Sequence, residues 1–432
     1  IESISRLSGL QEGMLFHYLY DQGSSAYIEQ FTCELSGLNL DIFKQSWRYI
    51  LDSHSILKSA FYHDKFKIPV QCVYADVEIP ISVLDYSHLN SKELVAAIQN
   101  LDTADLKKPF DLTTPPLMRV TLVKLKGDKY RMIWTSHHLL FDGWSLALIM
   151  EQFLTYYDKV VKNESLPLVK PDLFEDYIKY INSKDQQKAE DYWKTYLGGL
   201  EEGSMLPFIH THADRNSGVG TYLTNSFITS KELNSDIISF TQRNRLTVST
   251  LIQGVWSEIL HTYTDSNDVV FGVIVSGRPD DLPNVEQRVG LFINTLPFRS
   301  LRTENIPVVA WLNDIQNDQV NSRQYQYTSL HQAQGYTDVQ GDLFDSILTF
   351  ENYPVSEHLS NNQWQLVAEN PKTYGQSNYP LTIIVQNYDT LRIEFIYNTD
   401  LIDGIYIEKL KGHFEHVLKQ ITRSEAKMLN DI

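Results

Sequence analysis

The residues best suited to chemistry lie in one stretch, SHHLLFDGWS, at positions 136–145. It places two adjacent imidazoles, His137 and His138, ahead of Asp142 and Gly143, with three apolar residues between. One histidine is suited to act as a general base or a positioning group, with the acid as its support. A metal site has less support, because the spacing is not that of a zinc-binding helix. From this stretch alone, a catalytic site and a purely structural turn both remain open.

The elements around this stretch decide where its side chains point. Residues 115–125 and 129–136 are predicted as neighbouring strands joined by the turn KGDK, and residues 145–161 as a long apolar helix. Because side chains alternate along a strand, His137 and His138 are expected to point to opposite sides, so that only one faces a given cleft. Gly143 permits a tight turn into the helix, and Asp142 is placed to cap that helix or to hold a charged neighbour.

Strands and helices alternate along the rest of the chain. Residues 27–35 are predicted as a strand with Tyr27, Phe31, Cys33 and Leu35 on one face, followed by a helix over 41–51 that Asp41 caps. Residues 199–220 are predicted as a long surface connection. The alternation then restarts with helices over 247–264 and 404–421 and with strands over 268–277, 344–350, 379–386 and 391–398. The pattern predicts an α/β fold with mixed sheets, in two lobes of similar build.

Composition excludes several classes of protein. The 432 residues suffice for two or three domains, and the net charge of −17 argues against nucleic acid or an anionic membrane as a partner. Two cysteines, Cys33 and Cys72, are too few for a disulfide framework and fit a reducing cytoplasm. No nucleotide-binding glycine motif, secretory signal or membrane span is present. His210 and His212 are expected to be solvated rather than to bind metal. The first residue is Ile1 and not Met, which suggests that the chain is a piece of a longer polypeptide.

The stretch at 136–145 resembles the HHxxxDG signature of condensation domains of nonribosomal peptide synthetases, a motif shared with chloramphenicol acetyltransferase relatives and epimerization domains. Further segments agree with that family in order and spacing across essentially the whole chain. They are LSGLQEGMLFHYL at 7–19, FEDYIKY at 174–180, FGVIVSGRPDDLPNVEQRVGLFINTLPFR at 271–299, SLHQ at 329–332, LFDSILTFENYP at 343–354 and SNYPLTIIV at 377–385.

The resemblance implies two lobes like chloramphenicol acetyltransferase, residues 1–178 and 179–432, arranged as a V-shaped pseudo-dimer with a tunnel between them. It implies amide formation between a donor aminoacyl or peptidyl thioester and the amine of an acceptor aminoacyl thioester. Both would ride on phosphopantetheine arms of upstream and downstream peptidyl carrier domains, beside an adenylation domain. The chain itself is expected to bind no cofactor and no metal, and to act on neither nucleic acid nor membrane.

The resemblance also implies roles for individual residues. His138 is the reactive histidine, acting either as a general base or by positioning the acceptor amine. His137 and Asp142 support the site, and the Gly143 backbone N–H lies near the oxygen of the intermediate. Trp144 and Asn294 are candidate tunnel residues, with core packing or a structural hydrogen bond as the alternative. Arg299 is the better candidate partner for Asp142, because the sequence departs from the family pattern at Lys58.

One segment departs from the family pattern. Residues 53–61 read SHSILKSAF where the family carries an Arg-His-Glu-x-Leu-Arg pattern, so that Lys58 stands in the place of an arginine. A lysine does not reproduce the planar fork of arginine, which puts a family salt bridge at that position in doubt. Two alternative functions share the motif: epimerization of a carrier-bound residue, which DGWS argues against, and a non-catalytic platform for docking carriers. A stand-alone CoA-dependent acyltransferase shares the fold, whereas a cyclization domain would carry aspartates in place of the histidines.

Overall fold

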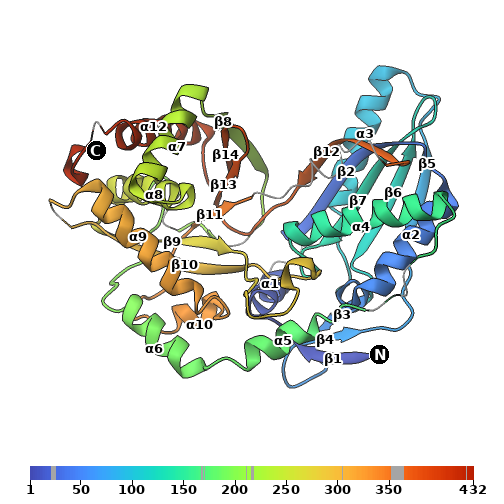
Figure 1. Cartoon of the computed structure of the whole chain (residues 1–432), viewed down its shortest axis with the longest axis horizontal. Helices are drawn as coiled ribbons and strands as arrows, with labels where there is room; N and C mark the ends of the chain where they lie inside the picture. Colours follow the sequence, from blue (N-terminus) through green and yellow to red (C-terminus); the bar gives the residue numbers. More distant parts are fainter. Residues whose placement is uncertain are drawn as a thin grey trace. The chain divides into compact units, whose positions relative to one another are not determined.

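The structure is a computed structural model that describes residues 1–20, 26–166, 169, 171–210, 212–215, 218–303, 305–351, 364–424 and 426–432. The chain divides into two compact units (Figure 1). Unit 1 is Ile1–Lys184, Arg278–Phe292 and Tyr353–Gln376, and unit 2 is Asp185–Gly277, Ile293–Asn352 and Ser377–Ile432. This division differs from the predicted lobes 1–178 and 179–432, because two segments of the second half of the chain belong to unit 1.

Unit 1 holds two sheets, one with the strand order β1-β4-β3 and one with the order β12-β2-β7-β6-β5. All their strand pairs are antiparallel except β5–β6. Its elements are β1 (Ser3–Arg6), α1 (Gly9–Tyr20), β2 (Ile28–Ser36), α2 (Leu40–Ser53), η1 (Ser55–Lys58), β3 (Ser59–Tyr62), β4 (Val70–Val73), β5 (Ile81–Asp85), α3 (Ser91–Leu106), β6 (Met118–Lys124), β7 (Lys129–His137), α4 (Gly143–Val161), α5 (Glu175–Asn182), η2 (Val285–Gln287) and β12 (Val367–Tyr374).

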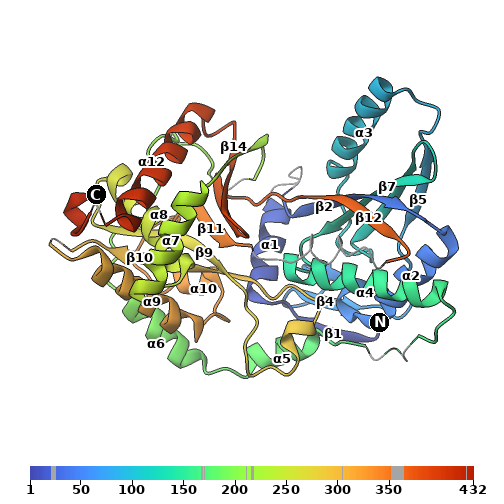
Figure 2. The ribbon, with the colours of Figure 1, turned by 45° about the horizontal axis from the view of Figure 1, so that its top comes forward.

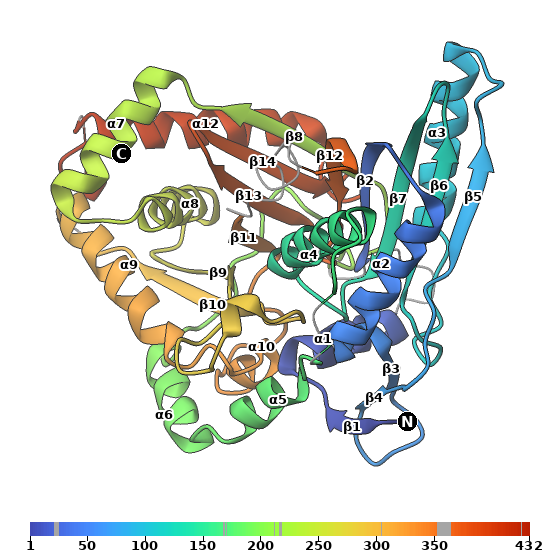
Figure 3. The same ribbon diagram turned by 45° about the vertical axis from the view of Figure 1, so that its right-hand side comes forward.

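The two faces of the five-stranded sheet differ in chemistry. One face is apolar and packs against α2 and α4: Trp134 of β7 contacts Phe31 of β2 and, with a ring-centroid distance of 4.9 Å, Trp47 of α2. The opposite face is polar and lies under α3, whose Asp105 accepts hydrogen bonds from Gln30 and Arg119. Figure 3 shows α2 and α4 on one side of this sheet and α3 on the other. The alternation predicted for residues 27–35 therefore separates an apolar core from a polar interface.

Two details of unit 1 correct the sequence prediction. Helix α2 is capped by Asn39, whose side chain accepts from the backbone N–H groups of Asp41 and Ile42, so Asp41 is not the cap. Strand β12, drawn in orange beside the blue β2 in Figure 2, pairs antiparallel with β2 although more than 300 residues separate them. Its sequence VAENPKTY has little apolar alternation, so sequence periodicity did not reveal it.

Unit 2 is built on one six-stranded sheet with the order β10-β9-β11-β13-β14-β8. Strand β11 runs parallel to both β9 and β13, and the remaining pairs are antiparallel, which confirms the predicted α/β class with mixed sheets. Its elements are α6 (Gln186–Tyr196), β8 (Tyr222–Ile228), α7 (Lys231–Asn244), α8 (Val248–Thr264), β9 (Asp268–Val275), β10 (Asn294–Leu301), α9 (Val308–Arg323), α10 (Leu330–Gln334), β11 (Ser346–Phe350), β13 (Leu381–Asn387), β14 (Leu391–Asn398), α12 (Gly404–Thr422) and η3 (Leu429–Asp431).

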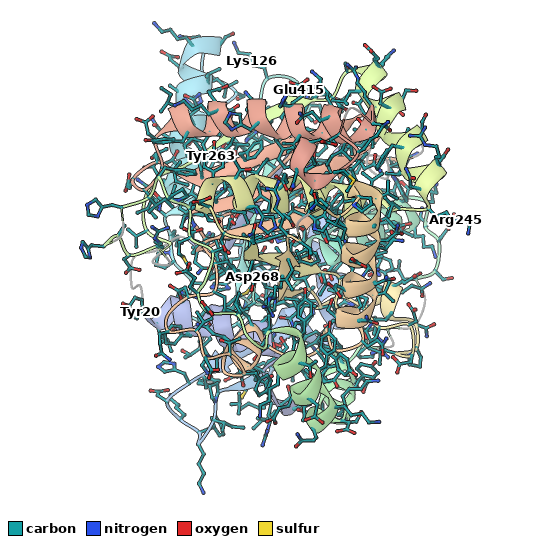
Figure 4. The ribbon with its side chains drawn as sticks, turned by 90° about the vertical axis from the view of Figure 1, so that its left-hand side faces the viewer. Tyr20, Lys126, Arg245, Tyr263, Asp268 and Glu415 are labelled. Atoms are coloured by element: carbon teal, nitrogen blue, oxygen red, sulfur yellow. The ribbon has the colours of Figure 1, made fainter. Side chains whose placement is uncertain are left out.

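The core of unit 2 lies between this sheet and helices α7, α8, α9 and α12. The predicted apolar face of α8 is confirmed, because Leu251, Ile252, Val255 and Ile259 are all buried. Figure 4 looks onto this unit and labels Tyr263 on α8 and Glu415 on α12. In the part of the chain that the structure describes, no helix is long and apolar enough to cross a bilayer.

The predicted surface connection over 199–220 is wrong in part. Leu206 and Ile209 are buried in the core of unit 2, and the backbone N–H of Leu206 donates to the buried carboxylate of Asp345. Arg215 forms an ion pair with the same carboxylate. The described residues of this segment form no helix or strand, but apolar residues among the polar ones bury it in the core of unit 2.

Candidate active site

The turn between β7 and α4 holds the residues singled out in the sequence. Strand β7 ends at His137, and the backbone N–H of His138 donates to the Tyr27 carbonyl at 2.8 Å, which continues the pairing with β2. Helix α4 begins at Gly143 and buries apolar residues such as Phe153, which packs against Phe43 and Trp47 of α2. His138 is therefore fixed between the end of a central strand and the N-terminus of a helix.

The ring of His138 is held through one of its nitrogens. Nδ1 lies 2.7 Å from the Phe141 carbonyl oxygen, which only accepts, so Nδ1 carries the proton and donates it. The same Nδ1 lies 3.5 Å from Oε2 of Glu29, and the side chain of His138 is 16% exposed. Nε2 forms no hydrogen bond with any residue that the structure describes. Its lone pair is free to accept a proton or a hydrogen bond.

His137 has a different environment. It is buried, its Nδ1 accepts from the Leu139 backbone N–H at 3.1 Å, and its ring makes T-shaped contacts with Tyr18 and Phe110. Burial, with a contribution from His138, lowers the pKa of His137 to about 3, so its imidazole is neutral. The two histidines have different neighbours, as the alternation of side chains predicts.

Asp142 is fully buried and both of its oxygens accept hydrogen bonds. Oδ1 accepts from the Ser145 backbone N–H at 2.9 Å, which caps α4, and from Arg278 Nη2 at 3.2 Å. Oδ2 accepts from the Phe292 backbone N–H at 3.0 Å. Asp142 therefore does both things that its position predicted: it caps the helix and it pairs with a cation.

The cation is Arg278, and the prediction of Arg299 is wrong. Nε and Nη2 of Arg299 bind both oxygens of Asp268 at 2.8 and 2.6 Å, and Arg299 Nη1 donates to the carbonyls of Tyr196 and Gly198. Asp268, labelled in Figure 4, begins β9 and lies diagonally across the β9–β10 ladder from Arg299. All of these groups belong to unit 2, whereas Asp142 and Arg278 belong to unit 1.

Arg278 and Ser145 join the turn to the segment 278–292. Nη2 of Arg278 also donates to Ser145 Oγ at 2.9 Å, and that hydroxyl donates to the Gly290 carbonyl and accepts from the Gly290 backbone N–H. The guanidinium also stacks over the ring of Phe292, 4.2 Å from its centroid. Neither Arg278 nor Ser145 was singled out in the sequence, although both lie within the motifs at 136–145 and 271–299.

Gly143 and Trp144 form the first residues of α4. The described glycines with positive φ do not include Gly143, so left-handed backbone does not explain the glycine there. As a first-turn residue its backbone N–H is among those that an α-helix leaves without an intrahelical partner. Trp144 is 36% exposed and its indole N–H donates to the Glu286 carbonyl at 2.9 Å, so it is not a core residue.

A family model described as "Condensation domain" matches residues 1–432 of this chain. The chain belongs to that family. The resemblance inferred from the motifs is confirmed.

Curated relatives are similar over the full length of this condensation domain. Bacitracin synthase 3 of Bacillus licheniformis is 33% identical over 435 residues, and gramicidin S synthase 2 of Brevibacillus brevis is 29% identical over 437 residues. Each alignment covers 100% of this chain but only 7% and 10% of those proteins. The chain therefore spans a tenth or less of the length of these relatives.

Solved structures share the fold. The starter condensation domain of rhizomide synthetase superposes with a TM-score of 0.80 at 18% identity, covering 100% of this chain and 97% of that one. The X-domain from teicoplanin biosynthesis superposes with a TM-score of 0.82 at 16% identity, covering 99% and 97%. These likenesses confirm the condensation-domain fold.

The remaining predicted residues of the condensation domain lie in unit 2. Asn294 begins β10, and its Nδ2 donates to the carbonyls of Gln326 and Thr328 at 2.8 and 2.7 Å while its Oδ1 accepts from the Thr295 backbone N–H. These contacts make Asn294 an anchor for the strand start. His210 and His212 are exposed. Of the motif at 343–354, the last three residues lie outside the described residues.

The segment that departs from the family pattern is buried in unit 1. Lys58 pairs with Glu2, with an Nζ–Oε2 distance of 3.3 Å. His54 Nε2 lies 2.6 Å from Gln152 Oε1, and its Nδ1 lies 3.9 Å from Asp172, which in turn pairs with Arg288. Burial lowers the pKa of His54. This cluster fixes the segment 278–292 from a second side and takes no part in the His138 turn.

Proposed function

We propose that this condensation domain catalyses amide-bond formation between two carrier-bound substrates. The amine of the acceptor aminoacyl thioester attacks the carbonyl carbon of the donor thioester. A C–N bond forms and the C–S bond breaks, and the proton lost from the attacking nitrogen ends on the departing thiol. The single observation that carries the proposal is the partly exposed His138 ring, whose Nδ1–H is fixed on Phe141 and whose Nε2 is free.

His138 acts through that Nε2. Its lone pair accepts a hydrogen bond from the acceptor amine, which orients the nitrogen toward the donor carbonyl and stabilises the positive charge that develops on it. Aminolysis of a thioester is favourable, so positioning supplies much of the acceleration. A full proton transfer to Nε2 is the general-base form of the same contact.

The other site residues support this contact. His137 is neutral and buried and holds the backbone of the turn, and Asp142 fixes the turn to Arg278 and to the start of α4. The Gly143 backbone N–H is assigned to the oxyanion that forms on the donor carbonyl, where a helix N-terminus favours negative charge. Trp144, Asn294 and Arg299 are assigned structural roles, on the hydrogen bonds that each one forms.

The partners follow from the family. The substrates arrive on phosphopantetheine arms of an upstream donor carrier and a downstream acceptor carrier, with an adenylation domain adjacent. The names of the relatives support this assignment: they are synthases about ten or more times as long as this chain, and one solved relative is titled a four-domain nonribosomal peptide synthetase. The arms are supplied by the carriers and are no resident cofactor of this chain.

A dipeptide assay with two loaded carrier domains tests the proposal. Wild type and His210→Ala, the control at an exposed histidine, are expected to form dipeptide, and His138→Ala is expected to be slower by about 100-fold or more. Near-normal dipeptide formation by His138→Ala would refute the role of the imidazole. Deuterium exchange at the substrate α-carbon without dipeptide would indicate epimerization, and carrier binding without turnover would indicate a docking platform.

A further inference from the structure

Glu29 is a carboxylate on the apolar face of β2, at the end nearest His138. In the β2–β7 ladder Glu29 lies opposite Ser136, and the bond from His138 N–H to Tyr27 continues the ladder by one pair. Glu29 and His138 are therefore diagonal cross-strand neighbours on one face of the sheet. The other residues of that row of β2, Phe31, Cys33 and Leu35, are apolar and buried. Burying a carboxylate in such a row is costly unless a positively charged or hydrogen-bonding group lies beside it.

The partner is the ring of His138. Glu29 Oε2 lies 3.5 Å from His138 Nδ1, and the two side chains are 22% and 16% exposed. Gly375, also in unit 1, lies beside the same carboxylate, because a Cβ built on it would be 3.4 Å from Glu29 Oε1. Burial raises the pKa of Glu29, while His138 acts to lower it and Asp142 to raise it. The acid and the imidazole thus share one partly dry site.

We propose that Glu29 is a positioning residue that sets the protonation of the His138 ring for amide formation. The inference rests on the proposed function and extends it. Together with the Phe141 carbonyl, the carboxylate keeps the proton on Nδ1 and so leaves the Nε2 lone pair for the acceptor amine. When Nε2 gains a proton or positive charge develops beside it, that positive charge favours the ionised form of Glu29, and the carboxylate in turn stabilises the cationic ring across 3.5 Å.

Other charged groups near the ring do not supply this charge. Asp142 is committed to Arg278 and to two backbone N–H groups, and His137 is neutral. From α1, the groups facing this turn are His17, beside the ring of Tyr27, and Tyr18, beside that of His137, and burial raises the pKa of the Tyr18 phenol. Glu29 is the carboxylate that faces the Nδ1 edge of His138.

The test compares charge at constant shape. Glu29→Gln keeps an acceptor oxygen but removes the charge, and Glu29→Asp keeps the charge on a shorter side chain. Glu34→Gln is the matched control, because Glu34 lies on the same strand but points to the opposite face. In each full-length protein, NMR of labelled histidine, assigned with His138→Gln, follows protonation of the His138 ring without substrate. The pH dependence of dipeptide formation is measured in parallel.

The expected result is a displacement to lower pH in Glu29→Gln alone. The His138 titration curve and the acid limb of the rate profile both move down by about one pH unit, while Glu29→Asp and Glu34→Gln stay near wild type. Superimposable curves for wild type and Glu29→Gln would overturn the inference. Failure of wild type to form any dipeptide would overturn the proposed function instead, and the titration curves would still decide whether Glu29 acts on the ring.

Discussion

Replacing Arg278 by methionine leaves the buried Asp142 without its cation. Asp142 is fully buried and the Arg278 side chain is 6% exposed, so water cannot take the place of the guanidinium. Removing one partner of a buried ion pair costs about 3–5 kcal/mol. Asp142 keeps two backbone donors, from Ser145 and Phe292, so we expect the lower end of that range, a loss of about 3 kcal/mol in the free energy of unfolding.

The assay is a double-mutant cycle. The free energy of unfolding in urea is measured for each variant by intrinsic fluorescence, on the transition that the substitutions displace. Asp142→Asn already removes the negative charge. Adding Arg278→Met to that variant should therefore lower the free energy of unfolding by less than Arg278→Met does in wild type, with a coupling energy of at least about 1.5 kcal/mol. Arg299→Met is the matched control, because that arginine binds Asp268, and it should add to Asp142→Asn within about 0.5 kcal/mol. The ion-pair argument fails if Arg278→Met and Asp142→Asn are additive.

Two further outcomes follow from packing and protonation. A Cβ at Gly290 would lie 2.2 Å from the buried ring of Phe174, so Gly290→Ala should lower the free energy of unfolding in urea by about 1–3 kcal/mol. Gly13 on α1 has open space around it, so Gly13→Ala should raise the same free energy by roughly 0.5–1 kcal/mol. Equal effects of the two substitutions would contradict the packing described for Gly290. The pKa of His137 is about 3 in the folded protein against an ordinary 6.5, so between these pH values the unfolded chain binds a proton that the folded protein does not, and stability falls as pH falls. His137→Gln should therefore flatten the pH dependence of unfolding between pH 6.5 and 4, and the exposed His210→Gln should not; parallel curves would show that His137 does not contribute.

The sequence predicted the His138 turn well because its signals are local. Strand alternation separated His138 from His137, and the helix-start signal identified Asp142 as a cap. The partner of Asp142 was mispredicted because Arg278 and Arg299 lie in the same motif at 271–299, and only the β9–β10 register shows that Arg299 faces Asp268.

Pairing between distant segments explains the other differences. Strand β12 is polar along most of its length and becomes a strand by adding to the edge of β2, which no local pattern encodes. Glu29 was visible in principle, as the charged member of an otherwise apolar alternating row. Its significance depends on a diagonal contact across the ladder, and that requires the register.

The membership of Arg278–Phe292 and Tyr353–Gln376 in unit 1 bears on engineering by recombination. Consider a chimera that joins the first half of this domain to the second half of a relative. It would replace Arg278 and strand β12 by those of the relative, but would keep their contacts in the first half, Asp142 and β2. Crossover points chosen by chain order alone thus cut through a folded body. Grafts that transfer Ile1–Lys184 together with both returning segments keep its native contacts in one parental set.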